Sequence, residues 1–84
     1  MLTTVDIERD ITNFVVQEFL SGDANRLNAE GSLLGDAIDS TGVLTLVGYL
    51  QERFGISVSD DDVRPENLDN IENLVKFVAR KQQA

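Results

Sequence analysis

The first hydrophobic pattern in the chain begins close to its N-terminus and has the period of an α-helix. Apolar residues recur at i, i+4, i+7, i+8 and i+12, in the order Ile7, Ile11, Phe14, Val15 and Phe19. This spacing places them on one face of an amphipathic helix. Thr3 or Thr4 can cap its start, and the turn-forming residues 21–23 can end it. The pattern therefore predicts a helix over most of the first twenty positions.

A second helical pattern runs from about Ser40 to Arg53. Five apolar side chains fall within an arc of about 100° and form the expected core face, namely Val43, Leu46, Val47, Leu50 and Phe54. The opposite side carries Thr41, Thr45, Gly48 and Glu52. Leu44 lies between the two faces, one turn after Ser40. It is either an exposed apolar contact for a partner or cargo, or a core residue at the flank of the helix.

Residues 22–38, between these two helices, show no sustained period and include three glycines. We predict a long loop anchored to the core by its large aliphatic residues, Leu27, Leu33, Leu34 and Ile38. The alternative is a flexible linker. It is disfavoured because it would leave four large apolar side chains exposed to water.

The segment after the second helix begins with Gly55, a residue suited to a left-handed helix cap. Ile56 and Val58 alternate with serines as in a strand, but no partner strand is predicted, so we interpret them as a connection that plugs the core. A short third helix is expected over residues 60–63 or around residues 65–68. Asp60, Asp61 and Asp62 fit a solvated helix start, since the ligand spacing and the central glycine of a calcium loop are missing.

The last helical pattern contains Ile71, Leu74, Val75 and Val78, at i, i+3, i+4 and i+7. Asp69 and Glu72 have the spacing of a capping box, with Asp in place of the usual Ser or Thr. Lys76, Arg80 and Lys81 gather at its C-terminal end, where positive charge is favourable. The patterns together predict one all-α domain over residues 1–84, with an ordered core of about 3–80. Its architecture is a four-helix bundle of three longer helices and one short helix.

Composition narrows the possible functions. The 84 residues include no cysteine and no histidine, which removes disulfides, thiolate chemistry and the usual general base, so an enzyme is not expected. The net charge is −8, and residues 36–72 hold nine acids against two bases. Such a surface repels nucleic acid and anionic membranes and favours partners with basic patches. With no long apolar segment and no signal-peptide pattern, we expect a cytoplasmic protein.

The candidate site is Asp39-Ser40, where a glycine-bearing loop gives way to the second helix. A serine hydroxyl in the first turn of a helix lies beside N–H groups without intrahelical partners, which suits a phosphate ester. Asp and Ser before an apolar run are also ordinary capping residues. The local residues alone leave both interpretations open.

The stretch from Gly35 to Leu44, which contains Asp39-Ser40, resembles the acyl carrier protein family. In that family an Asp-Ser pair opens the second helix of a four-helix bundle, and the serine carries a phosphopantetheine arm. The resemblance extends over most of the chain. Its further matching residues are Val43, Val47, Leu50 and Phe54, residues 55–58, and the final helix from Ile71 to Val78.

The resemblance implies a carrier that holds an acyl or aminoacyl group as a thioester. The group would sit on a 4′-phosphopantetheine arm attached to Ser40, and Asp39 would help to place that serine. The implied partners are a phosphopantetheinyl transferase, an acyl- or aminoacyl-loading ligase, and acyl-processing enzymes with basic docking patches. The protein itself would be a monomer, and neither nucleic acid nor a membrane is an expected partner.

The chain departs from the family on the second helix. Thr41 follows the serine where an aliphatic residue is usual, and Thr45 and Gln51 stand where many fatty-acid carriers have acids. These departures favour a dedicated carrier over a member of the general fatty-acid pathway. The residues expected to contact partners are Thr41, Leu44, Thr45, Gly48, Glu52, Asp60, Asp61 and Asp62. The competing hypothesis is an acidic helical adaptor that binds a basic partner and is never modified.

Overall fold

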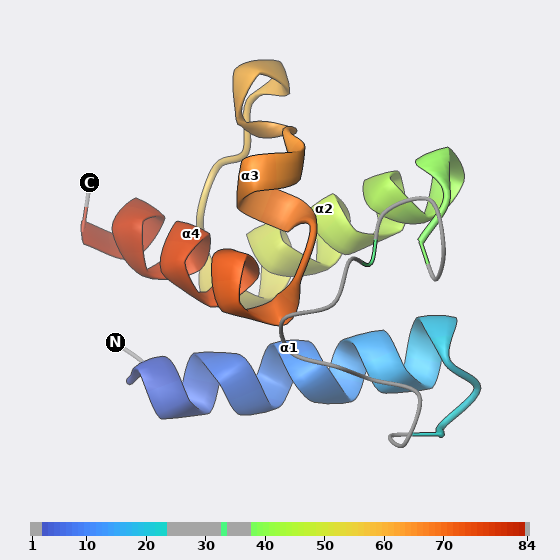
Figure 1. Ribbon diagram of the computed structural model, residues 1–84. Helices are drawn as coiled ribbons and strands as arrows, with labels where there is room; N and C mark the ends of the chain where they lie inside the picture. Colours follow the sequence, from blue (N-terminus) through green and yellow to red (C-terminus); the bar gives the residue numbers. More distant parts are fainter. Residues whose placement is uncertain (1–2, 24–32, 34–37, 84) are drawn as a thin grey trace.

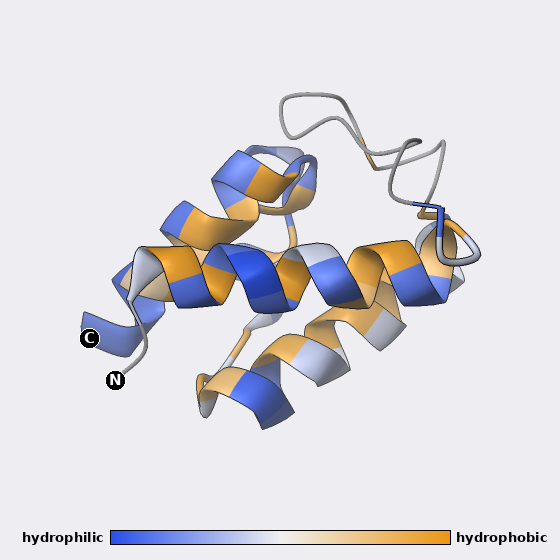
Figure 2. Ribbon diagram, turned by 90° about the horizontal axis from the view of Figure 1, so that it is seen from below, coloured by the Kyte–Doolittle hydropathy of each residue, from blue (hydrophilic) through white to orange (hydrophobic). Residues whose placement is uncertain are grey.

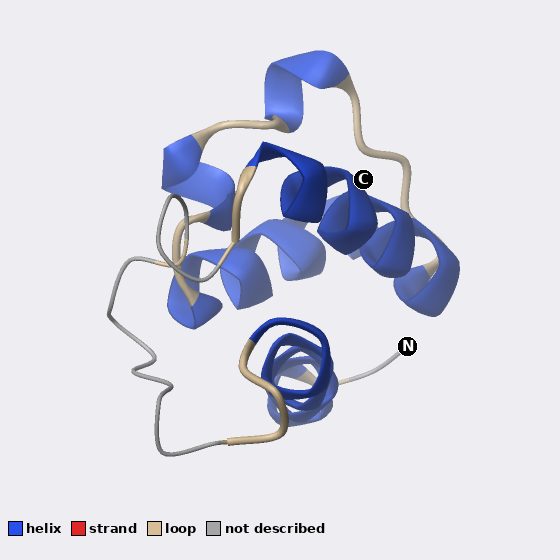
Figure 3. Ribbon diagram, turned by 90° about the vertical axis from the view of Figure 1, so that its right-hand side faces the viewer, coloured by secondary structure: helices blue, strands red, loops and turns tan. Residues whose placement is uncertain are grey.

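The computed structural model describes residues 3–23, 33 and 38–83. Its elements are α1 (Thr4–Phe19), α2 (Ser40–Phe54), the short 3-10 helix η2 (Asp60–Asp62), α3 (Pro65–Leu68) and α4 (Ile71–Gln83) (Figure 1). Helices and loops account for the described residues, and no strand is drawn among them (Figure 3). The expected all-α bundle of three longer helices and one short helix is therefore confirmed.

The direction of the helices brings the start of α2 close to the end of α1. In Figure 1, α1 runs along one side of the molecule, and its C-terminal end lies at the same end of the bundle as the start of α2. The start of α1 and the end of α4 lie together at the opposite end. None of the described helices is both long enough and apolar enough to cross a membrane.

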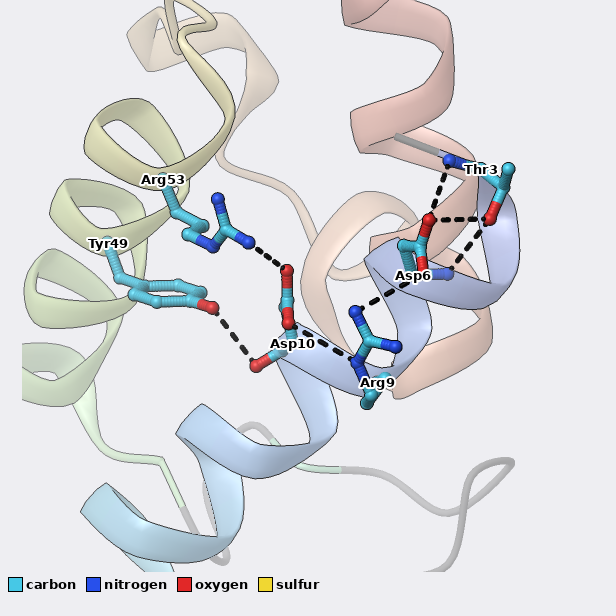
Figure 4. Close-up of polar contacts among 6 residues, drawn as sticks. All are labelled: Thr3, Asp6, Arg9, Asp10, Tyr49 and Arg53. Carbon is cyan, nitrogen blue, oxygen red and sulfur yellow. Dashed lines mark hydrogen bonds and ion pairs between the residues drawn. The ribbon is translucent and has the colours of Figure 1, made fainter. Parts of the chain in front are cut away.

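The start of α1 is closed by a capping box at Thr3, which settles the choice between Thr3 and Thr4. The Asp6 N–H donates to Thr3 Oγ1 at 3.2 Å, and the Asp6 carboxylate accepts the Thr3 hydroxyl at 3.0 Å (Figure 4). The hydrogen bonds from Thr3 lower the pKa of Asp6, with a smaller contribution from Arg9. After Phe19 the chain turns through Ser21 and Gly22, both at positive φ, so α1 ends where the sequence predicts.

The core is formed mainly where α1 and α4 pack together, with α2 and α3 completing it. Figure 2 shows hydrophobic and hydrophilic residues on different sides of the helices, as expected for amphipathic segments. The side chains that are almost fully buried include Ile7, Ile11, Val15, Ile38, Leu46, Leu50, Leu68, Ile71, Leu74, Phe77 and Val78. Leu33 and Ile38 are buried as predicted, and the other two expected loop anchors, Leu27 and Leu34, lie outside the described residues.

The buried line of α2 lies slightly to one side of the predicted core face. Leu46, Leu50 and Phe54 are buried as expected, but the fourth buried position is Gly42. Val43 and Val47 pack against the core and remain half-buried. Residues spaced by four therefore form the innermost line of α2.

The connection after α2 has the predicted character. Gly55 adopts the left-handed conformation, with φ 65°, and its N–H donates to the Gln51 carbonyl at 3.0 Å. Ile56 is buried, and Val58 packs against the core, so this segment plugs the bundle as expected. Both alternatives for the third helix occur in part, since η2 covers residues 60–62 and α3 covers residues 65–68.

The prediction that Asp69 caps α4 is wrong, because the cap lies one position later. The Asn73 N–H donates to Asn70 Oδ1 at 2.7 Å, so Asn70 is the cap. Asp69 instead closes α3, with its N–H donating to the Pro65 carbonyl at 2.9 Å and its own backbone in the right-handed helical region. A capping residue needs an extended backbone, which Asp69 does not have.

Candidate functional site

The first turn of α2 assigns different roles to Asp39 and Ser40. Asp39 is the capping residue, and its carboxylate accepts the Gly42 N–H at 2.7 Å. Its backbone carbonyl also accepts the Val43 N–H at 3.0 Å, the first hydrogen bond of the helix. Ser40 is the first helical residue. Because Asp39 performs the capping, the Ser40 hydroxyl is not used for it.

The surroundings of Ser40 fit a phosphate ester on its hydroxyl. The side chain is exposed, and the described part of the chain supplies no hydrogen-bond partner to Ser40 Oγ. The Ser40 and Thr41 N–H groups at the start of the helix also lack a partner among those residues. Free N–H groups and the helix dipole both favour an anion at this end. The residues present can therefore hold the phosphate end of a phosphopantetheine arm.

The side of α2 that faces solvent next to Ser40 is nearly neutral. We define the α2 outer face as Thr41, Leu44, Thr45, Gly48 and Glu52. Leu44 is 73% exposed, so it is not a core residue at the flank of the helix, and its role as a contact for a partner or cargo stays a prediction. Apart from its chain neighbours and the backbone of its own helix, no atom of the described residues lies within 4 Å of the position that a Cβ at Gly48 would occupy. This face thus offers one apolar side chain among small polar groups and a single carboxylate.

The three consecutive aspartates of η2 are not equivalent. Asp60 and Asp61 are exposed, whereas Asp62 turns toward α4 and pairs with Lys81 at 2.7 Å. The same Asp62 oxygen accepts the N–H and the hydroxyl of Ser59, each at 3.1 Å. The hydrogen bond from Lys81, followed by those from Ser59, lowers the pKa of Asp62 to about 2. Asp60 and Asp61 are therefore the η2 acids whose charge faces solvent.

The lowered pKa of Asp62 predicts how its contribution to stability depends on pH. The folded-state pKa of about 2 lies below the ordinary value of 3.8, so the contribution is complete above about pH 4 and is lost as the pH falls toward 2. Asp62→Asn should lower the urea midpoint at neutral pH, and its curve should meet the wild-type curve near pH 2. Asp61→Asn is the matched control and should leave the midpoint unchanged at both pH values. A constant difference between Asp62→Asn and wild type across this range would contradict the assignment.

A polar and aromatic contact joins α1 to the C-terminal half of α2. Arg53 Nη2 pairs with the Asp10 carboxylate at 2.6 Å, and the Tyr49 hydroxyl donates to the Asp10 backbone carbonyl at 3.0 Å (Figure 4). The Tyr49 ring stacks on Phe14 with 3.9 Å between the ring centroids, and Phe14 meets Phe19 edge to face. The sequence analysis missed this contact. Its partners are about forty residues apart, so no local spacing signals it.

Comparison with known proteins gives two concordant results. The family model described as "Phosphopantetheine attachment site" matches residues 14–78. Two curated relatives, each named "Acyl carrier protein", come from Arthrobacter sp. (strain FB24) and Paenarthrobacter aurescens (strain TC1). Each is 31% identical over 78 residues, an alignment that covers 79% of this chain and 94% of the relative. The matched region includes the C-terminal part of α1, all of α2 and α3, and most of α4.

Proposed function

The chain belongs to the acyl carrier protein family, non-catalytic carriers with a covalently attached 4′-phosphopantetheine, and on that premise we propose that Ser40 receives the arm. The observation that supports this assignment is the division of roles in the first turn of α2. Asp39 caps the helix, and the Ser40 hydroxyl stays exposed and unbonded among the described residues. The arm also supplies the thiol that a chain without cysteine lacks.

The attachment step requires only that the Ser40 hydroxyl reach the pyrophosphate of coenzyme A. The Ser40 oxygen forms a phosphoester bond to the phosphorus that carries pantetheine. The bond from this phosphorus to adenosine 3′,5′-bisphosphate breaks, and a base of the transferase takes the hydroxyl proton. Asp39 holds the first turn through the Gly42 N–H during this step. The N–H groups of Ser40 and Thr41 favour the negative charge of the product at this helix end.

The proposal is tested by incubating the protein with coenzyme A and a broad-specificity phosphopantetheinyl transferase. We expect the intact mass to rise by one phosphopantetheine, and peptide mapping to place the added group on Ser40. No mass increase under conditions that modify an ordinary acyl carrier protein would favour the unmodified adaptor. A mass increase on another residue would refute the assignment of Ser40.

We further propose that the loaded arm carries an acyl or aminoacyl thioester for a dedicated set of enzymes. Their contacts would lie on the α2 outer face, where Leu44 is the exposed apolar side chain and Glu52 the only acid. Asp60 and Asp61 would steer a basic partner from the side of η2, whereas Asp62 is already paired with Lys81. Rim charges mainly raise association rates, so a face with few of them suits a partner that recognises shape and apolar contact.

The double variant Thr45→Glu, Gln51→Glu tests this selectivity. The phosphopantetheinylated wild type should be a poor substrate for a general fatty-acid elongation system, and the added acids should raise its turnover, mainly through faster association. Gln51 Oε1 accepts the Val58 N–H at 3.0 Å, and a glutamate can keep this bond. Thr45→Gln with Gln51 unchanged is the neutral control, since it keeps the bond to Val58, and it should give no gain. Wild-type turnover equal to that of an ordinary acyl carrier would contradict the idea of a specialised carrier.

A further inference from the structure

We infer that Gly42 is a positioning residue for the attachment site, because only a residue without a side chain lets the first turn of α2 sit where it presents Ser40. The inference rests on the proposed attachment at Ser40 and adds a residue that does not itself touch the arm. Gly42 lies in the first turn of α2, two residues after Ser40, and is buried next to the end of α1. Its N–H donates to the Asp39 carboxylate.

The space around Gly42 is closed on three sides. A Cβ at this position would lie 3.0 Å from Ile38 Cγ2, 3.0 Å from Phe19 Cε1 and 3.3 Å from Asp39 Oδ1. These separations are shorter than ordinary van der Waals contacts, so a neighbour would have to move by a few tenths of an ångström. The backbone angles of Gly42 are those of a helix, so crowding, and not conformational strain, is what excludes a side chain.

The Phe19 ring is held in place, so the first turn of α2 is the part that would move. Phe14 meets the Phe19 ring edge to face, with 5.9 Å between centroids, and is itself stacked on Tyr49. The Tyr49 hydroxyl is bonded to the Asp10 carbonyl, which ties these rings to α1. On the other side of Gly42, Asp39 and Ser40 are exposed to solvent. A methyl group at position 42 would therefore push this turn away from α1.

Such a shift acts on the transfer step more than on recognition. A misplacement of about 1 Å at a reacting centre can cost about 10²-fold in rate. A shift of a few tenths of an ångström at Ser40 should thus lower kcat for arm transfer by about three- to tenfold, with the carrier as the varied substrate. KM should change less than kcat, because Leu44, Thr45 and Glu52 of the α2 outer face lie beyond the first turn.

The test measures arm transfer to Gly42→Ala by intact mass over time, at several carrier concentrations, with circular dichroism to establish that the variant is folded. Gly48→Ala on the same helix is the control for folding. It adds the same methyl group where nothing lies within 4 Å, and should raise Tm through helix propensity alone. Asn13→Ala, on the exposed side of α1, is the control for transfer and should leave kcat unchanged.

Rescue by a smaller neighbour separates crowding from other effects. Phe19→Leu removes one of the two 3.0 Å contacts near position 42 and leaves the contact with Ile38, so Phe19→Leu with Gly42→Ala should transfer the arm faster than Gly42→Ala alone. A kcat for folded Gly42→Ala within twofold of wild type, or a double variant no faster than Gly42→Ala, would overturn the inference. Should Gly42→Ala not fold, the double variant must fold and accept the arm, or the inference is wrong. Absence of the arm from Ser40 in the wild type would instead refute the proposed function.

Discussion

Ser40→Ala is expected to abolish attachment of phosphopantetheine completely while leaving the fold intact. The hydroxyl oxygen is the atom that would form the phosphoester, and alanine has none. The side chain is exposed and has no partner among the described residues, so its removal should change the free energy of unfolding by less than about 0.5 kcal/mol. The measurement is the intact mass after incubation with coenzyme A and transferase, together with Tm.

Ser57→Ala provides the matched control for this experiment. Ser57 is also exposed, and it lies in the connection after α2. This variant should take up the arm like the wild type and show the same Tm. If Ser40→Ala still gained the mass of one arm, the attachment would have to be on another residue.

Phe77→Ala is expected to have the largest effect on stability. Phe77 lies in α4, is 1% exposed, and is the largest of the almost fully buried side chains. Truncating such a ring costs about 3–5 kcal/mol, in a domain whose total stability is on the order of 5–15 kcal/mol. At about 4–8 °C per kcal/mol, Tm should fall by at least about 12 °C.

The control for Phe77→Ala is Val5→Ala, because Val5 is 73% exposed on α1. The free energy of unfolding of Val5→Ala should differ from that of the wild type by no more than about 0.5 kcal/mol. Thermal unfolding followed by circular dichroism would measure both variants. Similar Tm values for the two would show that the interior between α1 and α4 does not depend on the Phe77 ring.

Most of the fold could be predicted because its signals are local. The apolar residues of α1 recur with the helical period, Gly55 ends α2, and residues 60–68 carry start signals for both of the short helices found there. The candidate site could be proposed for the same reason. Asp39 and Ser40 are adjacent, and the role of each depends on its distance from the start of one helix.

The parts that could not be predicted depend on contacts between distant segments. Asp69 is not the cap of α4 because its backbone closes α3. The spacing of Asp69 and Glu72 in the sequence does not indicate this. Gly42 weakens the prediction of a helix if only propensity is considered, yet it is buried where a Cβ would lie 3.0 Å from the Phe19 ring. Likewise the Asp10–Arg53 pair becomes visible only when the two helices are placed side by side.

The stacked pair of Tyr49 and Phe14 gives the protein a built-in optical probe. The chain contains one tyrosine and no tryptophan, so all of its tyrosine fluorescence comes from a single side chain at the contact between α1 and α2. Burial, and next the nearby Asp10 charge, raise the pKa of Tyr49 above its ordinary value of 10.0. Alkaline titration of its absorbance therefore reports whether that contact is closed. Opening of the contact between α1 and α2 can be followed through this signal without an added label.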